Sequence, residues 1–443
     1  MPEPIRGRAH AFLFVLLCGA GLFWSLAGIV GAGNELSNVD RYSEANALRE
    51  VRNFLEHGLT RHAGLGNVVY PGLYPNDGFA REPEVARLSV TEEGVYTHYP
   101  PGPEYLLYAA AKLLGPEPVW RLRLLPVALG CAALFFLGLS VRARFGDAAA
   151  WLTMGTLALT PAVSDGFAGL HYQGYATALT MVEIGLTLRA GCPAASLAPF
   201  ALLGFAQGWL SFDYAFLVAL VPLSLELCLP CIDAAHRPDW RTAWARAILA
   251  GAGFAAAHGL HFLQVAAYWG SFEAASRDFG GAAAHRAAAG VPEAALDRVF
   301  FSLGNLKLYL YGLHPLNTGL SLPEAETPEN WSMFRFLGLA LGPWWVAITL
   351  AAMLRDAIRP GPDARKFRMD WYRASLTSIL TSSVWILAMA NHAGHHRHFL
   401  YRHLFFAFFV AVLFGAVRLA RQWERARAAG HRGLAFSFLG GYR

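Results

Sequence analysis

Long apolar runs, broken by short polar turns, make up most of this 443-residue chain. Several of these runs reach about 20 residues, the length that an α-helix needs to cross the hydrocarbon core of a bilayer. We therefore predict an all-α polytopic membrane protein with about ten transmembrane helices. The predicted spans are 11–32, 120–141, 148–165, 171–190, 196–212, 214–231, 246–268, 334–354, 374–391 and 400–420.

Two polar segments, 33–119 and 269–333, are much longer than the turns, and we expect them to form external loops that carry interfacial helices. Apolar residues recur every three to four positions at the start of the first loop. This spacing predicts an amphipathic helix that can lie on the membrane surface and that stops at Gly58. Its apolar stripe consists of Val39, Tyr42, Ala45, Leu48, Val51 and Leu55.

The end of the first loop combines a predicted hairpin around Glu93-Gly94 with a proline-rich stretch. In "HYPPGPEYLLYAAAKLLG" an apolar half-helix runs from about Glu104 to Gly115, and Pro103 suits its first turn. This helix is too short to cross a bilayer. With no fixed-period repeat in the sequence, we predict one membrane-embedded domain over residues 1–443, with both loops folded over it.

Composition and charge support a membrane protein. Hydrophobic residues make up 55% of the chain and charged residues 15%, against about 25% in a typical soluble domain. The net charge of +5 comes from Lys and Arg residues that flank the spans. The positive-inside rule explains this arrangement and predicts that both termini are cytoplasmic, so nucleic acid is not an expected partner. The apolar run of 11–32 is longer than the core of a signal peptide, which predicts a retained anchor.

The cysteines lie in or beside apolar segments, so no disulfide framework is predicted. Cys228 and Cys231 have the spacing of a redox motif, but they sit at a helix end outside any thioredoxin-like context.

Two motifs and their order along the chain carry a resemblance to a known family. Asp40 in "NVDRYSEA" opens the first loop, and "YPPGPEYLL" at 99–107 closes it. One span, a long loop with an acid on a surface helix, a Pro-Pro half-helix and then a bundle of spans together resemble the GT-C superfamily. These are membrane glycosyltransferases that use polyprenyl-phosphate sugars, such as protein O-mannosyltransferases and lipid A aminoarabinose transferases. Many members have two adjacent acids at the loop start, whereas Arg41 follows Asp40 here.

The resemblance implies transfer of a sugar at the periplasmic face of a bacterial inner membrane. The partners would be a polyprenyl-phosphate-linked donor, a glycan, lipid or protein acceptor, and membrane lipids. The half-helix would wall the active-site cavity, which makes His98 and Tyr99 candidates for substrate contact. Two alternatives are a flippase for a lipid-linked sugar, although no inverted repeat is found, and an O-antigen-ligase-like enzyme. A non-catalytic assembly protein is a third.

Glycosyl transfer needs a base for the acceptor and donors or cations for the departing phosphate. Asp40 is the candidate base, although Ser37-x-x-Asp40 also fits a helix cap. Glu44, one helical turn later, is a further candidate for substrate contact. The favoured expectation, however, is that its side chain faces water. Asp165 in the turn "TPAVSDGFAG" either binds metal or acceptor or simply forms the turn. The cofactor stays unknown, with a divalent metal ion left open.

Phosphate candidates come from two further segments. Lys307 is one, although it also suits an interfacial anchor among tyrosines. The other is "NHAGHHRHFLYRHLFF" (391–406), whose cationic side chains can bind an anionic headgroup. Snorkelling and a metal site of His392 and His396 are the alternatives for this segment. Its candidate residues are His395, His396, Arg397, His398 and Arg402.

Three ionisable residues fall inside predicted spans: Glu183, His258 and His261. Such groups are costly in hydrocarbon, so we expect them to face the bundle interior and to find polar partners there.

Overall fold

The structure is a computed structural model, which describes residues 41–70, 91–158, 163, 167, 169–189, 197–286, 362–389, 403 and 405–428. The predicted spans 11–32 and 334–354 lie outside the described residues.

Helices account for nearly all of the regular structure, and the described residues form no β-strand. The helices are α2 (Arg41–His57), α5 (Gly102–Leu114), α6 (Trp120–Phe145), α7 (Asp147–Ala158), α9 (Tyr172–Leu188), α10 (Ala198–Leu210), α11 (Ala215–Ile232), α12 (Trp240–Trp269), α13 (Phe272–Arg286), α17 (Pro362–Ala388) and α20 (Phe405–Ala428), with the 3-10 turn η2 (Phe212–Tyr214). Four stretches among the described residues are long and apolar enough to cross a membrane: Trp120–Phe145, Phe212–Ile232, Trp240–Trp269 and Phe405–Glu424. They match four predicted spans and confirm an all-helical membrane protein, while the total of about ten spans stays a prediction.

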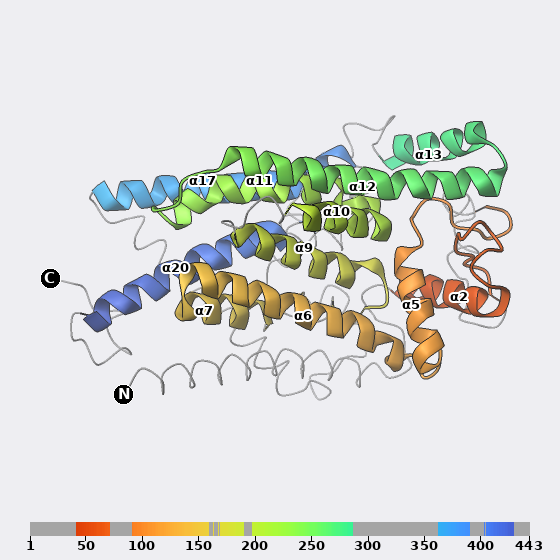
Figure 1. The fold of residues 1–443 in the computed structure, drawn as a ribbon, viewed down its shortest axis with the longest axis horizontal. Helices are drawn as coiled ribbons and strands as arrows, with labels where there is room; N and C mark the ends of the chain where they lie inside the picture. Colours follow the sequence, from red (N-terminus) through yellow and green to blue (C-terminus); the bar gives the residue numbers. More distant parts are fainter. Residues whose placement is uncertain are drawn as a thin grey trace, which may run out of the picture.

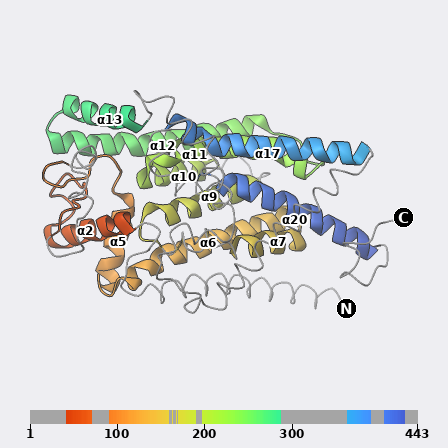
Figure 2. The ribbon, with the colours of Figure 1, turned by 180° about the vertical axis from the view of Figure 1, so that it is seen from behind.

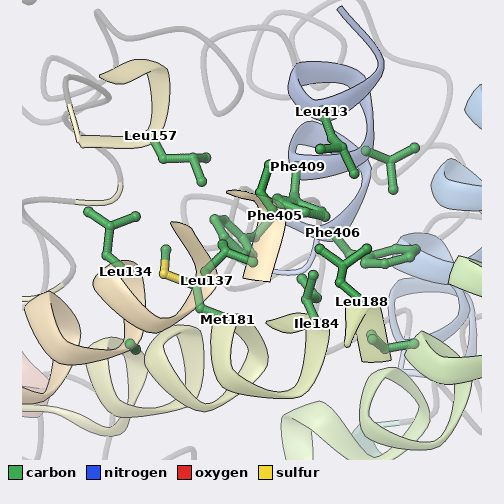
Figure 3. Close-up of a cluster of buried hydrophobic side chains, with 14 of the residues drawn as sticks. Leu134, Leu137, Leu157, Met181, Ile184, Leu188, Phe405, Phe406, Phe409 and Leu413 are labelled. Carbon is green, nitrogen blue, oxygen red and sulfur yellow. The ribbon is translucent and has the colours of Figure 1, made fainter. Parts of the chain in front are cut away.

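The long helices run side by side in one bundle, as both views show (Figure 1, Figure 2). α10 and α11 pack against α12, α11 also packs against α17, and α6 packs against α7 and α9. α20 joins the two sides because it contacts both α7 and α17. The largest apolar cluster fills the space between α6, α7, α9 and α20, where Leu137, Met181 and Phe409 are buried together (Figure 3).

α12 is the longest helix of the described part, with 30 residues. The predicted span 246–268 lies within this helix, which extends back to Trp240 because Asp239 caps it there. The Asp239 carboxylate accepts hydrogen bonds from the backbone N–H and the hydroxyl of Thr242, at 3.1 and 2.7 Å. Its first turns lie at one end of the bundle and its last turns at the other (Figure 1).

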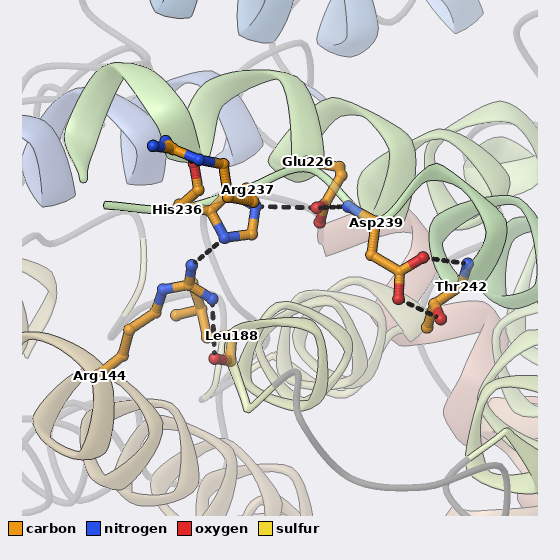
Figure 4. Close-up of polar contacts among 7 residues, drawn as sticks. All are labelled: Arg144, Leu188, Glu226, His236, Arg237, Asp239 and Thr242. Atoms are coloured by element: carbon orange, nitrogen blue, oxygen red, sulfur yellow. Dashed lines mark hydrogen bonds and ion pairs between the residues drawn. The ribbon is translucent and has the colours of Figure 1, made fainter. Parts of the chain in front are cut away.

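Arginines gather at one end of the bundle, which we call the arginine end after Arg142, Arg144 and Arg421. Arg144 donates to the Nδ1 atom of His236 at 2.7 Å, and the Nε2 atom of His236 donates to Glu226 at 2.8 Å (Figure 4). Because a guanidinium only donates, His236 is held as the neutral tautomer with its proton on Nε2. This chain of contacts ties α6 to α11.

The opposite end carries α2, α5 and α13, and we call it the loop end (Figure 1, Figure 2). η2 also lies there, because its Phe212 packs against Tyr99 of the first loop and Arg286 of α13. The predicted stripe of α2 is buried, since Ala45, Leu48 and Val51 pack against α5 and α6. Gly58 follows α2 with a φ of 80°, as expected of a glycine that stops a helix. Whether α2 touches a membrane surface stays a prediction.

The predicted hairpin lies partly outside the described residues, which begin again at Thr91. Around Glu93-Gly94 they form a turn: the N–H of Gly94 donates to the carbonyl of Thr91 at 2.9 Å, and the N–H of Thr91 donates to Val95 at 3.0 Å. The arm that follows also pairs across the loop: the N–H of Tyr96 donates to Gly66, and Asn67 and Val95 form an isolated antiparallel bridge.

Candidate functional site

The loop end contains three of the residues that the sequence singled out: Glu44, His98 and Tyr99. The other predicted site residues lie outside the described residues: Asp40, Asp165, Lys307, His395, His396, Arg397, His398 and Arg402. Their roles stay predictions.

Glu44 does not face water, contrary to the expectation from the sequence. Arg123 of α6 donates both of its terminal nitrogens to the two oxygens of Glu44, at 2.7 and 2.9 Å. The backbone N–H of Leu170 donates to the same carboxylate at 3.0 Å, and both charged side chains are only 1% exposed. A bidentate ion pair of this kind fixes the relative position of the two side chains. It is also costly to break, because removing one partner leaves a buried, uncompensated charge. Glu44 therefore anchors the first turn of α2 to α6 and to the segment before α9.

Tyr99 is the centre of an aromatic stack built from separate parts of the chain. Its ring lies 5.6 Å from Tyr96, 5.8 Å from Tyr172 and 4.6 Å from Phe212, measured between ring centroids. Tyr172 starts α9, and Phe212 starts η2, which leads directly into α11. The stack therefore joins the first loop to the N-terminal ends of α9 and α11. Aromatic rings at these separations attract one another beyond simple burial.

Arg286, at the end of α13, lies on this stack. Its guanidinium carbon is 4.1 Å from the ring centroid of Phe212 and 5.1 Å from that of Tyr99. These contacts are within cation–π distance. The residue is 9% exposed, so a positive charge is almost completely buried against the two rings.

A carboxylate lies beside the same stack. The hydroxyl of Tyr172 donates to Asp213 of η2, and Asp213 is itself buried. The hydroxyl of Ser211 accepts from the backbone N–H of Asp213 at 3.1 Å, which orients the turn. The short turn "SFDY" at 211–214 thus brings an acid and aromatic rings to the loop end.

His98 belongs to a second polar group, which joins the first loop to α13. Its Nε2 atom lies 2.6 Å from Asp278, and the indole N–H of Trp269 donates to the other oxygen of Asp278 at 3.2 Å. Burial raises the pKa of Asp278, but hydrogen bonds from His98, Thr97 and Trp269 outweigh it and leave the pKa below its usual value. An ionised Asp278 holds the proton of His98 on Nε2.

Two further carboxyls, Glu50 of α2 and Glu104 of α5, are buried in the first loop. Burial and the neighbouring Glu104 raise the pKa of Glu50 well above its usual value. Burial raises the pKa of Glu104 to about 7. Two acids that repel each other in a buried place do not both ionise easily, so the pair keeps a proton at neutral pH.

The half-helix α5 has the bounds that its prolines and Gly115 predict, with proline in its first turn. A side chain at Gly102 would collide with the carbonyl oxygen of Trp209, so this glycine lets α5 approach the end of α10. The hydroxyl of Tyr105 donates to Gly64 at 2.6 Å and accepts from Gln264 of α12 at 3.2 Å.

The intramembrane residues meet the expectation only in part. The Nε2 atom of His261 donates to the carbonyl of Thr97 at 2.9 Å, while His258 bonds within its own helix. Glu183 is fully buried in the bundle, as expected, but its carboxyl oxygens have no hydrogen-bond partner among the described residues.

Sequence reasoning missed Arg286, Asp213 and Glu104 as residues of the loop end. Asp213 gave a usable signal, because it is an acid in a short turn between apolar helices, like Asp165. Glu104 also gave one, as the single acid in an apolar half-helix. Arg286 gave none, since only the fold brings it to Tyr99. The described residues contain no group of three or more metal-ligating side chains, and a divalent metal ion stays a prediction.

Comparisons with known proteins found solved structures alone. No protein-family model and no curated protein matches the sequence. A structure of apo oligosaccharyltransferase from Archaeoglobus fulgidus matches 98% of this chain and 53% of its own, with a TM-score of 0.45 and 13% identity. Oligosaccharyltransferase AglB from the same organism, in complex with an inhibitory peptide and a dolichol-phosphate, matches 99% and 52%, with a TM-score of 0.45 and 15% identity.

ArnT from Cupriavidus metallidurans bound to undecaprenyl phosphate matches 94% of this chain and 79% of its own, with a TM-score of 0.38 and 14% identity. These proteins are GT-C glycosyltransferases, the class that the sequence resembles. The chain spans about half the length of the oligosaccharyltransferase chains that it matches. At TM-scores below 0.5, none of these likenesses decides the activity of this chain.

Proposed function

We propose that this protein is a membrane glycosyltransferase that moves a sugar from a polyprenyl-phosphate carrier to an acceptor at the loop end. The loop end would face the periplasm of a bacterial inner membrane, and both termini would be cytoplasmic. The acceptor would be a glycan, a lipid or a protein.

The observation that carries this proposal is the position of the proline-rich stretch on the bundle. Its Tyr99 stacks on Tyr172 and Phe212, at the ends of apolar helices and beside the buried Arg286. Aromatic faces suit sugar rings, which carry apolar C–H surfaces, and a cation suits a departing phosphate. A site of this chemistry at one end of a membrane bundle fits a donor whose lipid lies in the bilayer and whose sugar lies outside it.

The proposed reaction divides its work between a base and cations. The acceptor hydroxyl or amine attacks the anomeric carbon and gives its proton to Asp40, while the bond from that carbon to the phosphate oxygen breaks. The negative charge stays on the phosphate, where cations stabilise it. Candidates for that contact outside the described residues are Lys307, His395, His396, Arg397, His398 and Arg402. Asp165 is the candidate for a metal or acceptor contact.

Replacement of Asp40 tests the proposal. Asp40→Asn should lower sugar transfer at least about a hundredfold, because a positioned base contributes about 10²–10⁴-fold. The assay uses purified protein and a panel of radiolabelled polyprenyl-phosphate sugars, with transfer to membrane extract as the readout. Glu56→Gln, an exposed acid of the same first loop, is the control and should keep full activity. Wild-type activity in Asp40→Asn would reduce Asp40 to a helix cap.

A further inference from the structure

Arg286 poses a question of charge balance. It is nine-tenths buried, yet none of the described residues places a carboxylate within ion-pair distance of it. A buried charge is costly unless it is paired. Both carboxylates of its own helix have other partners: Asp278 is bonded to His98 and Trp269, and Glu273 pairs with Arg277.

The two rings against Arg286 compensate the charge only in part. Cation–π contacts stabilise a guanidinium through its flat faces. The N–H groups point outward in the plane of the guanidinium and still need acceptors, because each of the five is a donor. The described residues supply no hydrogen-bond acceptor to Arg286, so its contacts to them are the rings alone.

We propose that Arg286 is an anion-binding residue whose edge holds a phosphate group between the first loop and α13. A planar guanidinium matches two phosphate oxygens at once, and the contacts with Phe212 and Tyr99 hold it beside the aromatic stack. The identification of that phosphate as the headgroup of a lipid carrier rests on the proposed function. The anion site itself rests on the geometry of Arg286.

The position of Arg286 links the anion to the aromatic stack. Tyr99 contacts both the guanidinium and Tyr172, and the hydroxyl of Tyr172 donates to Asp213. A phosphate at Arg286 would therefore lie beside the rings proposed to receive the sugar. The second loop, through α13, would supply a positive charge that the first loop lacks at this place.

Direct binding measurements test the proposal without any transfer reaction. Undecaprenyl phosphate, undecaprenol and inorganic phosphate are the probes, and binding is measured on the purified full-length chain in lipid nanodiscs. Arg286→Met keeps an apolar chain against the rings and removes the charge. We expect it to weaken undecaprenyl phosphate binding by about tenfold or more, since a charge-assisted contact contributes about 1.5–3 kcal/mol. Arg286→Lys should recover part of the affinity, because a lysine keeps the charge but loses the two-pronged geometry.

The matched control lies on the same helix. Arg277 is 76% exposed and pairs at 3.9 Å with Glu273, so Arg277→Met should leave binding unchanged. Undecaprenol, which has no phosphate, should bind the wild type and Arg286→Met equally. Competition by inorganic phosphate in the wild type would show that the anion alone is recognised. Arg286-dependent binding without such competition would assign the site to the lipid-linked phosphate.

Unchanged binding of both phosphates in Arg286→Met would overturn the proposal. So would an equal loss of undecaprenol and undecaprenyl phosphate, because it would reflect a damaged fold. Failure of the glycosyltransferase proposal gives a different result: Arg286-dependent phosphate binding with no sugar transfer from any donor.

Discussion

At the scale of single residues, the loop end shows three ways to bury a charge. Glu44 is neutralised by Arg123 through two hydrogen bonds. Glu104 lies beside a second acid and has a raised pKa. Arg286 lies against two aromatic rings, and we infer that a ligand completes its environment. These three cases can be told apart by experiment. An ion pair responds to removal of its partner, a protonated acid responds to pH, and a ligand-binding arginine responds to addition of the ligand.

The raised pKa of Glu104 predicts a pH-dependent stability. The folded-state pKa of Glu104 is about 7, against the usual 4.5. The stability that the protonated Glu104 contributes to the folded state is therefore fully present below pH 4.5 and is lost as pH rises through 7. Glu104→Gln should remove this loss and raise stability at pH 8 on the order of 3 kcal/mol, given about 1.4 kcal/mol per pKa unit between 4.5 and 7. Thermal unfolding in detergent from pH 5 to 8 measures it. The exposed Glu56→Gln is the control and should show the same loss of stability with rising pH as the wild type. The same loss in Glu104→Gln would contradict a raised pKa of Glu104.

At the scale of elements, α2 is held to the bundle by one buried ion pair in addition to its apolar stripe. The oxygens of Glu44 contact α6 and the backbone of Leu170 at once. A helix fixed in this way cannot rotate or slide without breaking a buried contact. The acid that directly precedes α2 in the sequence, Asp40, is the proposed base, so this anchor is a feature that catalysis would need.

Removing the anchor on one side should destabilise the fold strongly. We expect Glu44→Gln to cost about 3–5 kcal/mol, because it leaves Arg123 buried and charged. The double variant Glu44→Gln with Arg123→Met should be more stable than the sum of the single effects predicts. Chemical unfolding of the four proteins measures this coupling. The exposed pair of Arg52 and Glu117 is the control, and Glu117→Gln should change stability by less than about 1 kcal/mol.

Local signals in the sequence predicted several elements well. Prolines and a glycine marked both ends of α5, and an apolar stripe with a terminal glycine marked α2. The predicted span 246–268 lies within α12, which extends back to the cap formed by Asp239 with Thr242. The contacts of the site could not be predicted. Arg123 is 79 residues from Glu44, and Arg286 reaches Tyr99 from another loop. No periodicity reports such pairings, because they depend on how the helices pack.

At the scale of the molecule, the bundle has two ends of different character. Arg144 and its partner His236 lie at one end, and the aromatic stack of Tyr99 and Tyr172 lies at the other. The positive-inside rule assigns the arginine end to the cytoplasm. The proposed function needs the same assignment, because it requires the loop end outside.

Cysteine labelling in intact cells tests this orientation. Ala234 and Glu273 are both exposed, at the arginine end and the loop end respectively. With the five native cysteines replaced, Glu273→Cys should react with a membrane-impermeant maleimide, and Ala234→Cys should react only after the cells are opened. The reverse result would place the proposed site in the cytoplasm and contradict the proposed function.

The length of α12 sets the depth of the site in the membrane. Thirty residues at about 1.5 Å each give a rod of about 45 Å, close to the full thickness of a bilayer with its headgroups. Exposed tryptophans mark both ends of this rod, Trp240 and Trp244 at the start and Trp269 at the finish, and such rings settle at membrane interfaces. The length of α12 therefore sets the distance between the two ends of the bundle. It fixes how far α13 stands above the lipid tails, and a thinner or thicker bilayer would tilt the bundle and move Arg286 relative to any headgroup that it meets.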